Sequence, residues 1–113
     1  MTRRKNADPR RARRRPATTR RVAPALTRWV CPPALTLREV AAAHRALRKL
    51  LTARAPVSID CSRLDCIDTA GAQLLAAFVR ERREAGGEAR LEAAREPLLA
   101  AARLLGLTEL EPA

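Results

Sequence analysis

The chain has 113 residues, 31% of them charged, and a formal net charge of +11. This length suffices for one compact hydrophobic core and is too short for two. No apolar run is long enough to cross a bilayer, and no apolar stretch follows the basic N-terminal residues as in a secretory signal. We therefore expect one small cytoplasmic domain, in which the three cysteines stay reduced.

The positive charge is concentrated at the N-terminus. Residues 1–22 contain ten basic residues and one acidic residue, a net charge of +9, which leaves only +2 for residues 23–113. Because the first stretch is rich in Arg and Pro and has almost nothing to bury, we expect a disordered basic tail over residues 1–21. The folded domain is expected over residues 22–113.

A basic tail of this kind is compatible with phosphate partners. It could contact nucleic acid or an anionic membrane face, since both present closely spaced negative charges. The tail contains no aromatic residue on which a base could stack. A solvated tail is the simpler interpretation, and nucleic acid is not the partner that we expect.

The first half of the folded part predicts two strands and one helix. A strand over Leu26–Cys31 must end at Pro32-Pro33. Thr36 and Glu39 have capping-box spacing, which predicts the start of a helix that Pro56 closes. In Val57–Cys61, apolar and polar residues alternate, as in a half-buried strand.

The second half predicts two helices and a strand. The amphipathic run Gln73–Arg83 predicts a helix that ends at Gly86-Gly87. A weak strand over residues 89–93 and a third helix beginning at Pro97 follow. Residues 107–110 suggest a last short extended piece.

The resulting order is β-α-β-α-β-α, which predicts an α/β layer with parallel pairing between strands that helices join. The second helix is expected to bury Leu74, Leu75, Phe78 and the stem of Arg82. Ligand or partner sites in such folds lie at the carboxyl ends of the strands.

The motif Asp68-Thr69-Ala70-Gly71 lies at such an end, where a strand stops and a helix begins. The first turn of a helix has free N–H groups and a partial positive charge, which suit a hydroxyl that can carry a phosphate. Ala70 and Gly71 are small and are expected to leave the backbone open to a partner, with Gln73 in the same turn. The motif predicts a contact surface with Thr69 as its control point, although Asp68 and Thr69 could simply cap the helix.

Metal binding and catalysis have little support in the sequence. Asp60, Asp65 and Asp68 could form a carboxylate group, but aspartates in loops are common turn formers. Cys61 and Cys66 lack a second ligand pair and are expected to be buried and structural. There is no Gly-rich phosphate loop and no Ser/His/Asp or Cys/His set. We therefore expect no metal, no cofactor and no catalytic residue.

Residues 57–62, followed by residues 66–75, resemble the STAS domain, the family of bacterial anti-sigma-factor antagonists and related regulators. The family pattern is a strand, a short loop and Asp-Ser/Thr-x-Gly running into a Leu-rich helix. Residues 101–107 are similar to the last helix of the family and its Gly-Leu ending. The resemblance covers roughly residues 29–110 and implies the small mixed-sheet α/β fold of the family. It departs from the family at the segment before the first helix, which is short and interrupted by prolines.

The resemblance implies a protein that binds a partner through Asp68–Gly71 and Gln73, and not an enzyme. In the first interpretation, Thr69 is the switch hydroxyl that an anti-sigma or kinase-type regulator phosphorylates. In the alternative, the chain is similar to MlaB, an accessory subunit of a phospholipid-transport ABC system, whose motif faces the ATPase. A chemotaxis-cluster regulator is a further alternative. Membrane association is expected only through the partner.

Overall fold

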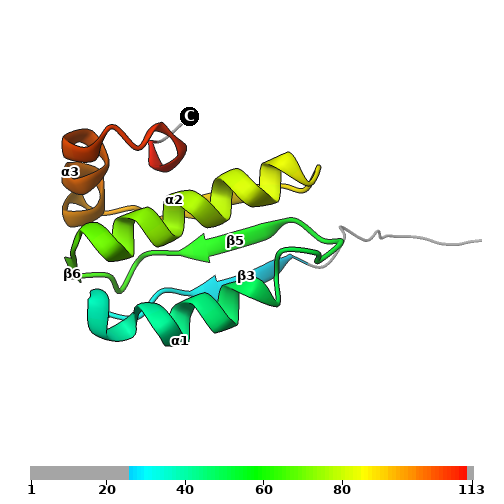
Figure 1. The fold of residues 1–113 in the computed structure, drawn as a ribbon, viewed down its shortest axis with the longest axis horizontal. Coiled ribbons are helices and arrows are strands. Elements are labelled where there is room, and N and C mark those ends of the chain that lie inside the picture. The colour runs from blue at the N-terminus through cyan, green and yellow to red at the C-terminus, as the bar shows by residue number, and fades with distance from the viewer. Residues whose placement is uncertain (1–25, 112–113) are drawn as a thin grey trace, which may run out of the picture.

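The computed structural model describes residues 26–111. The predicted tail over residues 1–21 and the predicted start of the domain at residue 22 lie outside the described residues. The elements, in chain order, are β3 (Thr27–Val30), β4 (Ala34–Leu35), α1 (Leu37–Arg48), β5 (Val57–Asp60), β6 (Cys66–Ile67), α2 (Thr69–Glu84), β7 (Ala89–Glu92), α3 (Glu96–Leu105) and the 3₁₀ helix η2 (Thr108–Leu110) (Figure 1). No helix within residues 26–111 is long and apolar enough to cross a membrane.

The main sheet contains β3, β5 and β7 in that spatial order, and both pairings are parallel. The predicted α/β fold and the alternation of strands and helices are thus confirmed. Right-handed crossovers between successive neighbouring strands place α1 and α2 on the same face of the sheet, where the two helices contact each other. The strands run toward the end of the molecule at which both helices begin (Figure 1).

A second, two-stranded sheet forms at that end. β4 pairs in parallel with β6, and Leu35 lies opposite Ile67. The carbonyl of Pro33 accepts hydrogen bonds from the N–H groups of Asp65 and Cys66, at 2.8 and 3.0 Å. The pair joins the segment before α1 to the segment before α2. Two-residue strands have no detectable period, so neither was predicted.

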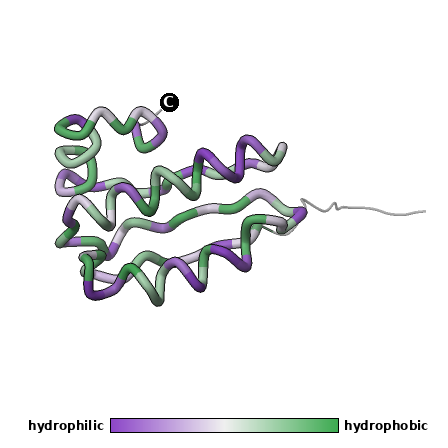
Figure 2. The backbone as a smooth tube through the Cα atoms, viewed as in Figure 1, coloured by the Kyte–Doolittle hydropathy of each residue, from purple (hydrophilic) through white to green (hydrophobic). Residues whose placement is uncertain are grey.

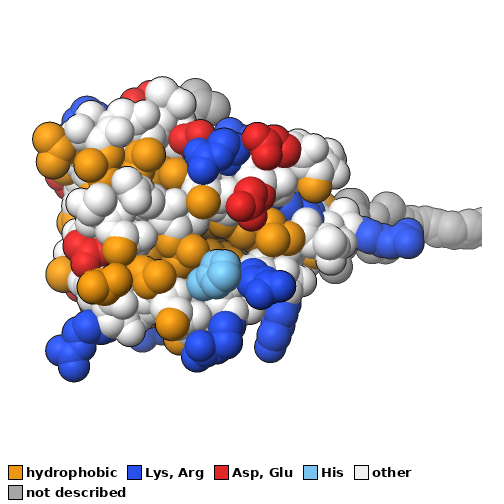
Figure 3. Space-filling model, viewed as in Figure 1, with side chains coloured by type: hydrophobic (Ala, Val, Ile, Leu, Met, Phe, Trp, Pro, Cys, Tyr) orange, Lys and Arg blue, Asp and Glu red, His pale blue; other side chains and the backbone are white. Residues whose placement is uncertain are grey.

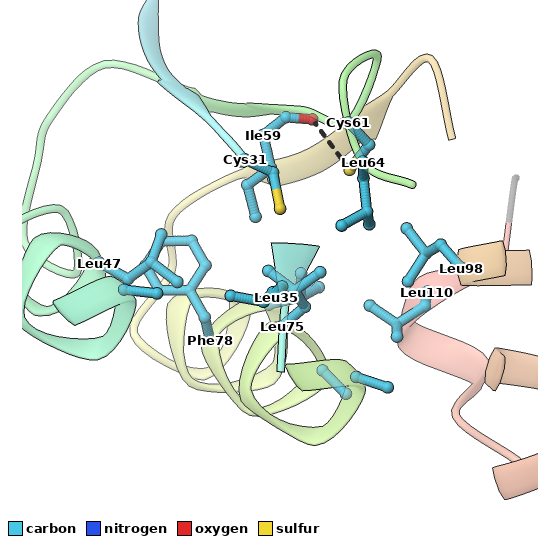
Figure 4. Close-up of a cluster of buried hydrophobic side chains, with 14 of the residues drawn as sticks. Cys31, Leu35, Leu47, Ile59, Cys61, Leu64, Leu75, Phe78, Leu98 and Leu110 are labelled. Carbon is cyan, nitrogen blue, oxygen red and sulfur yellow. Dashed lines mark hydrogen bonds between the residues drawn. The ribbon is translucent and has the colours of Figure 1, made fainter. Parts of the chain in front are cut away.

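The hydrophobic core lies between the main sheet and its helices. In Figure 4, Leu47, Leu75 and Phe78 lie in one cluster with Ile59 of the central strand. The tube in Figure 2 is accordingly hydrophobic along much of β5, with hydrophilic segments recurring on both helices. Leu98 and Leu110 close the core from α3 and η2. The predicted extended piece over residues 107–110 is wrong, because this segment turns into η2 and buries Leu110.

The prediction of a half-buried strand over residues 57–61 is wrong at Ser58, which is fully buried. Ser58 lies in the central strand between Arg28 of β3 and Arg90 of β7. The guanidinium of Arg28 pairs across the central strand with the carboxylate of Glu92 at 3.5 Å. The Ser58 hydroxyl has no hydrogen-bond partner in the part of the chain that the structure describes.

The cysteines differ in exposure. Cys31 and Cys61 are buried, as expected for Cys61, and burial raises their pKa values to about 11 and about 12. The Cys61 thiol donates to the carbonyl of Ile59 at 3.7 Å (Figure 4). Both thiols therefore stay protonated at neutral pH and are poor nucleophiles. The expectation for Cys66 is wrong: it is exposed, because in the short strand β6 Ile67 is the more buried of the two side chains.

Arg82 of α2 is buried along its whole length, with 2% of its surface exposed, whereas the sequence predicted burial of its stem only. Its guanidinium carries no carboxylate partner among the described residues and instead donates to five backbone carbonyls. These belong to Leu50, Leu51, Ala53, Ala55 and Glu88, at 2.6 to 3.1 Å. Arg82 thus holds the chain that follows α1 against the C-terminal part of α2. A Cβ on Gly87 would lie 2.6 Å from the Arg82 guanidinium carbon, which explains the second glycine of the Gly86-Gly87 pair.

We predict that Arg82→Leu lowers the free energy of unfolding by about 3 kcal/mol, because five partly buried carbonyls lose their donor at once. The matched control is Arg80→Leu, which removes an exposed arginine of the same helix and its ion pair with Glu109. The control should change the free energy of unfolding by less than about 1 kcal/mol. Urea unfolding followed by circular dichroism measures both, and equal midpoints would show that the carbonyl contacts of Arg82 add no stability.

Candidate partner-binding site

The carboxylate of Asp68 connects the beginnings of the two long helices. Asp68 is the N-cap of α2, and its Oδ1 accepts a hydrogen bond from the N–H of Gly71 at 3.0 Å. Its Oδ2 accepts a second one from the N–H of Leu37, the first residue of α1, at 2.9 Å. The bond from Gly71 and, to a smaller extent, the bond from Leu37 lower the pKa of Asp68. Its carboxyl group is therefore ionised at neutral pH. The predicted capping role of Asp68 is confirmed, and its bond to α1 is new.

The start of α1 has its own cap. Thr36 and Glu39 form the predicted capping box, in which the Thr36 N–H donates to Glu39 Oε1 at 2.8 Å. The Thr36 hydroxyl donates to the same oxygen at 2.6 Å, and this bond lowers the pKa of Glu39. Both helices therefore begin side by side with capped N-termini. Their partial positive charges lie at one end of the molecule.

Gly71 is buried, and the close approach that it permits is to its own chain. A Cβ at this position would lie 2.0 Å from the carbonyl oxygen of Leu35 in β4. The structure therefore contradicts the expectation that Gly71 leaves its backbone open to a partner. The absence of a side chain lets α2 begin directly against β4.

Thr69 and Gln73 are exposed and stand four residues apart on α2, on the same side of the helix. Within residues 26–111, no group forms a hydrogen bond with the Thr69 hydroxyl. Ala70 is half-buried beside them. Leu37, held nearby through its bond to Asp68, is 73% exposed. We call these residues (Leu37, Asp68, Thr69, Ala70 and Gln73) the Thr69 surface.

Leu37 is the member of this surface that the sequence did not predict. Its position next to Thr69 depends on a hydrogen bond between residues 31 apart in the chain, which no local pattern contains. One feature of the sequence does point to Leu37. It is an apolar residue directly after the N-cap Thr36, and it does not lie on the helical face that Ala43 and Leu47 bury.

The three aspartates considered for a metal site have separate partners. Asp60 accepts from the N–H of Ser62 at 2.9 Å, and Asp65 pairs with Arg95 at 3.2 Å. Asp68 caps the helices. Among residues 26–111, no three His, Cys, Asp or Glu side chains gather in an arrangement that could hold a metal ion.

A parallel sheet whose crossover helices begin together, with Asp-Thr-Ala-Gly at the start of the second, defines a small α/β domain of the STAS type. The model of the family described as "Mlab, STAS domain" matches residues 34–112. Because this match covers most of the chain, the chain belongs to that STAS family. A crystal structure of a sulfate transporter family protein from Wolinella succinogenes is similar in fold, with a TM-score of 0.61 and 18% identity. The similarity covers 79% of this chain and 74% of that chain. No curated protein matches the chain.

We predict that Asp68→Asn lowers the melting temperature at pH 7. The amide has one oxygen, so it can accept from α1 or from α2 but not from both. Because the folded pKa of Asp68 is depressed, its stabilising contribution is present above the ordinary carboxyl pKa of about 4 and is lost as the pH falls through the folded value.

The difference in melting temperature between wild type and Asp68→Asn should therefore shrink below about pH 4, as scanning calorimetry at several pH values would show. Asp65→Asn is the control, since that exposed carboxylate makes one ion pair and should change the melting temperature little at either pH. A difference that stays constant down to pH 2 would contradict the role given to the Asp68 charge.

Proposed function

We propose that the chain is a non-catalytic accessory subunit of the MlaB type, which binds the ATPase of an ABC transporter through the Thr69 surface. The observation that carries this proposal is an exposed Thr69 at the common start of α1 and α2, in a chain that the Mlab family model matches. The match to this family favours the transporter interpretation over an anti-sigma-factor antagonist.

The chemistry of the Thr69 surface suits a folded protein partner. Its exposed groups are a hydroxyl, an amide and the apolar side chain of Leu37, with the small Ala70 between them. The single charge, on Asp68, is already bound by two N–H groups of its own chain. Burying this surface therefore costs little desolvation of charge, whereas a small ion would find no free charged group there.

The test is co-purification of the tagged chain from cells that express it together with the ATPase and permease of an ABC transporter from the same organism. We predict that wild type retains the ATPase and that Thr69→Glu reduces its recovery at least about tenfold, because an unpaired charge would be buried in the contact. Thr52→Glu adds the same charge to an exposed turn after α1 and should leave recovery unchanged. Wild type that always purifies alone, or equal recovery with Thr69→Glu, would contradict the proposal.

A second candidate is a switch of the anti-sigma-antagonist type, in which Thr69 is phosphorylated. The observation that favours it is the free, exposed hydroxyl at the first residue of α2, where a phosphate meets the positive end of the helix. Incubation with a kinase-type regulator and ATP should then increase the intact mass by one phosphoryl group. The increase should disappear in Thr69→Ala and persist in Thr108→Ala. An unchanged mass for wild type would reject this candidate and leave the transporter proposal standing.

A further inference from the structure

The outward side of α1 has an unusual composition. No acidic residue is exposed on α1 or at its C-cap, Lys49, and His44 is the one exposed polar residue there besides the Arg and Lys side chains. The exposed residues are Leu37, Arg38, Ala41, Ala42, His44, Arg45, Arg48 and Lys49. Glu39, the single acidic residue of α1, is half-buried and bound to Thr36.

Three of these cations follow one line along the helix. Arg38, Arg45 and Lys49, with Ala42 between them, recur at intervals of four, three and four residues, which is the spacing of one helical face. Their eleven-residue separation corresponds to about 16 Å at 1.5 Å per residue. This face points away from α2, because the groove between the two helices is lined by His44, Leu47 and Arg48 on the α1 side. We call Arg38, Arg45 and Lys49 the α1 basic stripe.

The side chains of the stripe have no ion-pair partner among residues 26–111, a property that they share with Arg48, Arg54 and Arg63. Elsewhere in the described part of the chain, five arginines form ion pairs with carboxylates: Arg28, Arg80, Arg90, Arg95 and Arg103. Figure 3 shows basic side chains projecting into solvent along the α1 side of the molecule, while most acidic ones lie on the α2 side. Carboxylates of residues 26–111 therefore do not neutralise the positive charge of the stripe.

We propose that the α1 basic stripe binds the phosphate headgroups of an anionic bilayer surface. Charge complementarity carries the proposal, because three uncompensated cations on one exposed helical face attract negatively charged headgroups. Ala42 adds no bulk between the cations, so the helix can lie along a flat surface. The stripe offers no aromatic side chain for stacking and no amide for reading base edges, which favours a bilayer over nucleic acid.

This contact is separate from the Thr69 surface and does not depend on the proposed function. It adds a direct membrane contact, whereas the sequence alone assigned membrane association to the partner. Each cation near an anionic surface strengthens partitioning roughly fivefold, so the three together contribute about a hundredfold.

The experiment is sedimentation of the full chain with vesicles that contain phosphatidylglycerol, compared with vesicles of phosphatidylcholine alone. The test variant is Arg38→Gln/Arg45→Gln/Lys49→Gln. The control variant carries the same change of charge at three arginines that are exposed but ion-paired: Arg28→Gln/Arg90→Gln/Arg103→Gln. We predict that wild type binds only the anionic vesicles, that the test variant binds about a hundredfold more weakly, and that the control loses less than about fivefold.

Equal losses in the two variants would overturn the proposal, because net charge alone would then govern binding. Full binding by the test variant would also overturn it, because the contact would then lie outside the stripe. If wild type binds duplex DNA more tightly than the anionic vesicles at the same salt concentration, and the test variant loses that binding, the stripe is a nucleic-acid surface instead. Melting curves of both variants verify that they are folded.

Discussion

One carboxylate fixes the part of the molecule on which its proposed function depends. Asp68 directs one oxygen to the N–H of Gly71 in α2 and the other to the N–H of Leu37 in α1. A helix start leaves several N–H groups without partners, so a shared acceptor stabilises both starts and sets their separation. Thr69 follows Asp68 directly and is therefore presented at a defined place between the two helices.

The four residues of the motif Asp68–Gly71 differ in whether they contact the rest of the chain or face solvent. Gly71 faces inward, because the carbonyl of Leu35 occupies the space where its Cβ would be. Asp68 acts within the chain as the shared cap. Thr69 is exposed, whereas Asp68 and Ala70 are half-buried. In the pattern Asp-Thr-x-Gly, the Thr therefore presents an exposed hydroxyl. The Asp and the Gly hold the start of α2, and with it that hydroxyl, in position.

The sequence predicted the features that arise within a few residues and missed those that depend on distant ones. The capping box of Thr36 and Glu39 and the cap at Asp68 are local, with partners three residues away, and both were predicted. The bond from Leu37 to Asp68 and the β4–β6 pair join segments about thirty residues apart, and two-residue strands leave no period to detect. The burial of the Arg82 guanidinium was missed for a related reason. Its acceptors are backbone carbonyls, which every residue has and which composition therefore cannot indicate.

Arg82 and Asp68 together hold α1 to α2 at both ends. Asp68 joins the two N-termini, while Arg82 binds the carbonyls of the segment that follows α1, among them those of Leu50 and Ala53. Because both ends are joined in this way, α1 cannot tilt or slide along α2 without breaking these hydrogen bonds. The Thr69 surface and the α1 basic stripe therefore keep a constant orientation to each other. A partner bound at Thr69 would in consequence stand at a fixed angle to any surface that the stripe contacts, because the frame between them is stiff.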